Sequence, residues 1–77
     1  MTNKLGRVSW QKFEKFLFET GCFFVHEEGD HRKYKKTGLL RPIIIPRVKE
    51  LPIFVIQNNL RTLGISREEY QEIMKRL

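Results

Sequence analysis

Residues 29–36 read GDHRKYKK, so one of the chain's two histidines follows a glycine and an aspartate and precedes four basic residues. An imidazole transfers protons near neutral pH, and cationic side chains hold phosphate groups. His31, with Arg32, Lys33 and Lys35 after it, is therefore a candidate for proton transfer beside a bound phosphate. A histidine next to a turn is also common as a plain surface residue, and the residue types alone leave both interpretations open.

The positive charge of the chain is concentrated around this histidine. Between His31 and Lys49 there is no acidic residue, and the seven basic ones are Arg32, Lys33, Lys35, Lys36, Arg41, Arg47 and Lys49. The net charge of +6 favours a polyanionic partner such as nucleic acid or an anionic surface. A basic strand edge that discourages aggregation is the alternative interpretation.

The other residues that could take part in catalysis or metal binding give weaker signals. His26 lies two residues beyond Phe24, and strict alternation along a strand places both on one face, which favours a structural histidine at a strand end. The same alternation separates Glu27 from Glu28, so they make a poor chelating pair, and we expect no metal or other cofactor. Cys22 is the only cysteine, excludes an internal disulfide, and is expected in the core.

The sequence predicts one helix before residues 29–36 and three strands that include and flank these residues. Residues 9–20 place four apolar side chains at spacings of three and four, with Ser9 as a cap and Gly21 as a stop. Residues 22–28, 31–37 and 39–46 are rich in strand formers, and their short links predict hairpins and an antiparallel meander. Pro42 and Pro46 cannot donate ladder hydrogen bonds, which predicts that the third strand lies at an edge or is broken there.

The strand that begins at His31 has two faces with different properties. If Tyr34 points inward, His31, Lys33 and Lys35 line the opposite, open face of the sheet.

Two helices are expected after the strands. Pro52 suits a helix start, apolar residues then recur at helical spacing, and Gly64 suits its end. The sequence SREE at residues 66–69 forms a capping box for a third short helix that runs to about Arg76. We predict one α+β domain over residues 1–77, with the helices on one face of the sheet. No segment is apolar enough for a signal peptide or a membrane span, so we expect a cytoplasmic protein without membrane contact.

The order of motifs resembles the HicA-like toxin family of bacterial mRNA interferases. The resemblance covers about residues 9–74 and is carried by GCFFVHEEGDHRKY, IIIPRVKEL and LRTLGISREEY. It implies a fold like the double-stranded RNA-binding domain, with a helix, three antiparallel strands and a helix. It also implies ribonuclease activity on mRNA and inhibition by a partner antitoxin, HicB, whose contact surface we expect to be acidic.

The resemblance implies that His31 is the catalytic residue, since the family histidine follows the glycine of the hairpin. Around it, Arg32, Lys33, Lys35 and Arg47 are predicted to bind RNA. The family commonly has serine where this chain has Asp30, and often a second histidine where it has Arg32. Asp30 would repel RNA phosphates or orient the imidazole. The alternatives are a non-catalytic double-stranded RNA-binding module with the same fold, and a protein-interaction domain.

Overall fold

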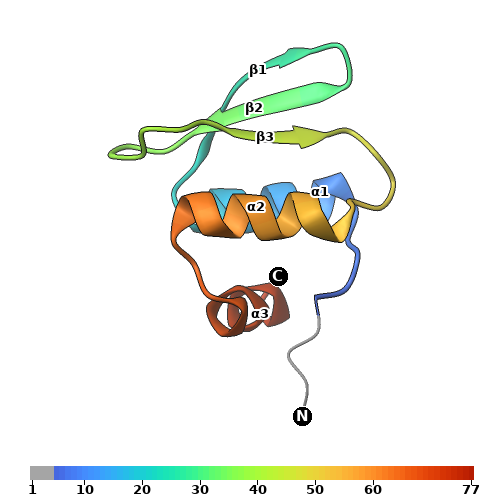
Figure 1. Ribbon diagram of the computed structural model, residues 1–77, viewed down its shortest axis with the longest axis vertical. Coiled ribbons are helices and arrows are strands. Elements are labelled where there is room, and N and C mark those ends of the chain that lie inside the picture. The colour runs from blue at the N-terminus through green and yellow to red at the C-terminus, as the bar shows by residue number, and fades with distance from the viewer. Residues whose placement is uncertain (1–4) are drawn as a thin grey trace.

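The computed structural model describes residues 5–77, which form one three-stranded sheet and three helices (Figure 1). In chain order the elements are α1 (Trp10–Glu19), β1 (Phe23–Glu28), β2 (His31–Lys35), β3 (Ile43–Pro46), α2 (Ile53–Leu63) and α3 (Arg67–Lys75). Helix, three strands and two helices is the predicted α+β order, and the fold class is confirmed.

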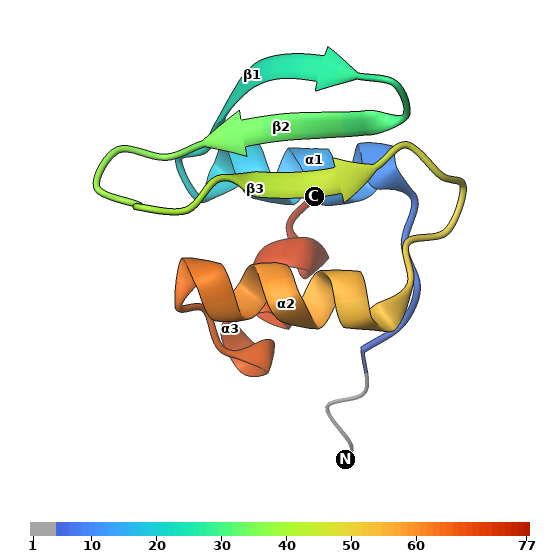
Figure 2. The same cartoon turned by 45° about the horizontal axis from the view of Figure 1, so that its top comes forward.

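The sheet is an antiparallel meander with the strand order β1-β2-β3 (Figure 2). The β1–β2 hairpin turns at Gly29 and Asp30, and Gly29 has the positive φ of 59° that glycine adopts without strain. Strand β3 lies at an edge, as Pro42 and Pro46 predicted. The central strand is therefore the one that begins with His31.

One face of the sheet is covered and the other is open. Helices α1 and α2 lie along the covered face, and α3 lies beyond them, farther from the sheet (Figure 1). Tyr34 is fully buried between sheet and helices, as predicted, and Cys22 is 5% exposed. The buried core also contains Phe13, Phe16, Leu17, Ile43, Ile45, Leu51, Ile56, Leu60 and Tyr70.

The helix boundaries follow the capping signals in the sequence. The Ser9 hydroxyl accepts a hydrogen bond from the Lys12 N–H, and the Ser66 hydroxyl accepts one from the Glu69 N–H, each at 3.1 Å. Gly64 ends α2 in the left-handed conformation with a φ of 72°. Residues 5–77 contain no helix with the length and apolar character that crossing a membrane requires.

The predicted third strand was too long. It was expected over residues 39–46, but β3 begins only at Ile43. Pro42 has no N–H to donate to β2, and the Leu40 side chain is fully exposed in the loop before it. Strand β2 likewise ends at Lys35, two residues earlier than predicted.

A β-bulge in β1 overturns the predicted facing of His26. Phe24 is opposite Tyr34 and His26 is opposite Lys33, so two steps along β1 match one step along β2. Phe24 therefore shares the covered face with Tyr34, and the two rings lie 5.8 Å apart. His26 shares the open face with Lys33, so the expectation that His26 and Phe24 lie on one face was wrong.

Candidate active site on the open sheet face

Strand β2 presents three of the predicted site residues on the open face. His31 and Lys35 are exposed and Lys33 is partly exposed, while Tyr34 between them is fully buried on the other side. This alternation gives the open face an imidazole and two ammonium groups along one strand. Ile44 of β3, opposite Lys33, leaves 47% of its surface exposed beside them.

Strand β1 adds two further side chains to this face. Glu28 is directly opposite His31, and His26 is directly opposite Lys33. A shallow pocket of about 170 Å³ joins them, and its lining residues are His26, Glu28, His31, Arg32, Lys33 and Ile44. The arrangement places two imidazoles, a carboxylate and an ammonium group around one hollow, which is a setting for proton transfer at a bound anion.

Arg47 lies at the same end of the sheet as His31. Pro46, the residue before it, is opposite His31, and the Arg47 N–H donates a hydrogen bond to the Asp30 carbonyl at 2.7 Å. The Arg47 side chain is 48% exposed, and its Nε lies 3.5 Å from a Glu27 carboxylate oxygen. Asp30 itself is exposed in the turn. Arg47 is therefore a half-exposed cation close to the hairpin that carries His31.

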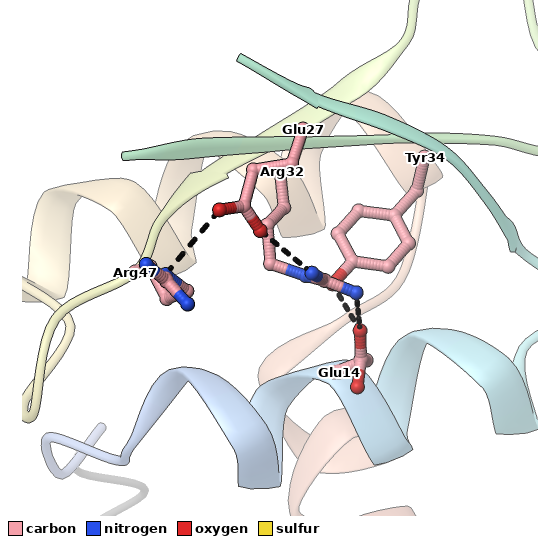
Figure 3. A network of polar contacts seen from close by, with 5 residues as sticks. All are labelled: Glu14, Glu27, Arg32, Tyr34 and Arg47. Carbon is pink, nitrogen blue, oxygen red and sulfur yellow. Dashed lines mark hydrogen bonds and ion pairs between the residues drawn. The ribbon is translucent and has the colours of Figure 1, made fainter. Parts of the chain in front are cut away.

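Arg32 is held on the covered face by a polar network (Figure 3). Its guanidinium donates hydrogen bonds to Glu27 of β1 and to Glu14 of α1, each at 2.8 Å, and to the Tyr34 hydroxyl at 3.0 Å. The Tyr34 hydroxyl in turn donates to Glu14 at 2.5 Å. The Arg32 and Glu14 side chains are both only 18% exposed. The network therefore ties helix α1 to strands β1 and β2.

Aromatic rings complete the surroundings of Arg32. Its guanidinium carbon lies 4.1 Å from the centre of the Phe24 ring and 4.9 Å from that of the Trp10 ring. Both distances are within the range of cation–π attraction. The hydrogen bonds to Tyr34, Glu27 and Glu14 together raise the pKa of Arg32 above its usual range, against a smaller opposing effect of burial.

The structure thus brings together only some of the predicted residues. His31, Lys33 and Lys35 share the open face, with Arg47 near one end, whereas the Arg32 guanidinium is engaged on the covered face. His26 and Glu28 join His31 and Lys33 in the pocket although simple alternation assigned His26 elsewhere. The run FFVHEE alone gave no signal of this, because the irregularity depends on Phe24 packing inward while Glu27 meets Arg32.

Three other surface hollows, formed by residues within the described range 5–77, lack this combination. They have volumes of about 260, 370 and 460 Å³ and are lined by no histidine and no carboxylate. Within residues 5–77, no three His, Cys, Asp or Glu residues gather as ligands for a metal ion. Of these four hollows, the pocket on the open face is the one that combines histidines, a carboxylate and an ammonium group.

The two tyrosines of the chain should make the folded form less stable at alkaline pH, and their ionisation can be used to measure this. Burial, with a smaller contribution from the hydrogen bond to Glu14, raises the pKa of Tyr34 to about 12. Burial also raises the pKa of Tyr70, whose hydroxyl has no hydrogen-bond partner within residues 5–77, to about 12. The unfolded chain releases these protons near pH 10. The folded form is therefore expected to lose stability from about pH 10 to 12.

This expectation can be measured by tyrosinate absorbance at 295 nm. The native protein should show little tyrosinate at pH 11, whereas the protein in denaturant should titrate with a midpoint near pH 10. Tyr34→Phe and Tyr70→Phe each remove one of the two groups. Native tyrosines that titrate with a midpoint near pH 10 would contradict the prediction.

Comparison with known protein families identifies the family of this fold and site. The family model described as the HicA toxin of bacterial toxin-antitoxin systems matches residues 10–65, which run from the start of α1 to the residue after the Gly64 cap of α2. The matched segment includes the whole sheet and the pocket on its open face. A search of curated proteins finds no match.

Proposed function

This chain belongs to the HicA toxin family of bacterial toxin-antitoxin systems, and from this premise we propose that it is an endoribonuclease that cleaves mRNA in the cytoplasm without a metal ion. One observation supports this most directly. His31 stands exposed on the open sheet face, in a pocket that also contains Lys33. An imidazole and a cation at one accessible hollow are the groups that phosphodiester cleavage needs.

RNA supplies the nucleophile of the reaction in its own 2′-hydroxyl. The oxygen attacks the adjacent phosphorus, and the bond from phosphorus to the 5′-oxygen breaks. His31 takes or gives a proton in this exchange, which contributes roughly 10²- to 10⁴-fold to the rate. Lys33 is the nearest cation to the reacting phosphate, and Lys35 and Arg47 hold neighbouring phosphates.

The chemistry of the RNA ends tests the proposal. The purified protein, incubated with mRNA in the presence of EDTA, should produce 2′,3′-cyclic phosphate and 5′-hydroxyl ends. A strict requirement for Mg²⁺ or fragments with 3′-hydroxyl ends would contradict this mechanism. RNA that is bound in a salt-sensitive manner but stays intact would indicate a non-catalytic RNA-binding module. No affinity for RNA at low salt would instead indicate a protein-interaction domain.

A toxin of a toxin-antitoxin system has an antitoxin partner, and we infer that this partner is HicB-like and covers the open face. The net charge of +6 and the exposed cations of β2 favour an acidic contact surface. An acidic surface imitates RNA phosphates, so it would block the site that RNA uses. Mutual exclusion of RNA and antitoxin in a binding competition would support this placement.

Lys35→Ala should weaken RNA binding without changing the fold. Lys35 is exposed on the open face, so its loss removes one phosphate contact. The slope of log K against log salt concentration should become shallower by roughly 0.7 to 1. Affinity can be measured by fluorescence anisotropy over a series of salt concentrations.

Lys75→Ala is the matched control. It also removes one positive charge, from an exposed lysine on α3, away from the sheet. The control should leave the salt slope unchanged. An equal effect of the two substitutions would show that RNA responds to net charge and not to this face.

A further inference from the structure

We propose that His26 is a second catalytic residue, and that His26 and His31 divide between them the two proton transfers of RNA cleavage. The proposal rests on the proposed function and adds a group to it. It starts from the bulge in β1, which turns His26 away from the Phe24 face and onto the face of His31.

The positions of the two histidines follow from the strand register. His31 is opposite Glu28, and His26, two residues before Glu28, is opposite Lys33. His26 and His31 are therefore diagonal neighbours on one face, a relation that places Cα atoms about 7–8 Å apart. Both line the same pocket. Two imidazoles at this separation can reach opposite sides of one phosphate group placed between them.

The reaction has two proton transfers, and a separate imidazole can serve each of them. The 2′-hydroxyl gives its proton to one neutral imidazole as the bond from the 2′-oxygen to phosphorus forms. The other imidazole, in its protonated form, gives a proton to the 5′-oxygen as the bond from that oxygen to phosphorus breaks. One proton is taken and one is given, so the step balances without a further reagent. Lys33 is directly opposite His26 and follows His31 by two residues, so it is next to both histidines. Its ammonium group would stabilise the negative charge of the phosphorane.

The lining of the pocket shows which groups surround His26. The titratable or charged groups around the pocket are Glu28 on its own strand and His31, Arg32 and Lys33 on β2, and from β3 the pocket receives only Ile44. The Arg32 guanidinium is engaged with Glu14 and Glu27. Since His26 is exposed, folding does not require an imidazole there. Its replacement therefore reports on chemistry more than on stability.

The test compares two RNA substrates that differ at the leaving atom. One is an ordinary oligonucleotide, and the other carries sulfur in place of the 5′-oxygen at one linkage, because a thiolate leaves without being protonated. His26→Gln and His31→Gln should each lower kcat on ordinary RNA by roughly 100-fold or more, with KM within a few-fold of wild type. On the sulfur substrate one variant, the one that lacks the proton donor, should regain a rate close to wild type, and the other should not.

The pH dependence gives a second measurement. Wild-type kcat/KM should pass through a maximum with pH, and each variant should lose one limb of that profile. Thermal unfolding of His26→Gln should match that of wild type.

Two sets of results separate this inference from the function on which it rests. If wild type cleaves RNA and His26→Gln cleaves it equally fast, only the role of His26 is overturned. Rescue of both variants or of neither by the sulfur substrate would also overturn the division of proton transfers. If wild type leaves RNA intact, the nuclease proposal and this inference fail together.

Discussion

Replacing His31 with alanine should reduce RNA cleavage by roughly 10²- to 10⁴-fold, because the reaction would lose a proton-transfer group. The side chain is exposed at the start of β2, beside the turn, and does not belong to the core. Its removal should therefore change the free energy of unfolding by no more than about 0.5 kcal/mol. Rates of cleavage of a labelled oligonucleotide and a thermal melt measure the two effects on one sample.

The same substitution should relieve toxicity in cells. Expression of wild type without antitoxin is expected to arrest bacterial growth and deplete mRNA, and His31→Ala at the same protein level should permit growth. Lys75→Ala, which changes an exposed residue of α3, should stay toxic. Equal toxicity of wild type and His31→Ala would remove His31 from the active site.

The parts of the fold set by local chemistry were predictable from the sequence. The spacing of Phe13, Phe16 and Leu17, the cap at Ser9 and the glycine at residue 64 defined helix positions to within about a residue. The Gly29-Asp30 link predicted a hairpin, and Tyr34 took the inward position that its ring area favoured. These features depend on near neighbours in the chain, so a sequence displays them directly.

The features that sequence reasoning missed depend on contacts between distant segments. The bulge allows Phe24 to pack on Tyr34 while Glu27 meets Arg32, and alternation along β1 alone carries no record of those partners. Arg32 looked like another cation of a basic strand, because its partner Glu14 lies 18 residues earlier. The charge pattern indicated strand β2, and alternation separated Arg32 from the cations of the open face, but only the tertiary contacts show what binds its guanidinium.

Replacing Arg32 with alanine should destabilise the protein by about 3 kcal/mol, because it leaves the largely buried carboxylates of Glu14 and Glu27 without their cation. For a domain of this size, that loss lowers the melting temperature by roughly 12–24 °C. Arg32→Lys should recover only part of the loss, since one ammonium group cannot reproduce the guanidinium's separate hydrogen bonds to Glu14, Glu27 and Tyr34. Calorimetry or circular dichroism measures the melting temperature.

Arg7→Ala is the matched control for this prediction, because Arg7 pairs with Glu50 at 3.5 Å while both side chains are about two-thirds exposed. Exposed ion pairs contribute little to stability, so the melting temperature of Arg7→Ala should stay within a few degrees of wild type.

Measuring RNA affinity shows whether Arg32 also contacts RNA. If Arg32→Ala were as stable as wild type and lost RNA affinity as Lys35→Ala does, the guanidinium would belong to the RNA surface. A large stability loss in Arg32→Ala, with RNA affinity retained below its melting temperature, would show instead that it positions β1 and β2 on α1.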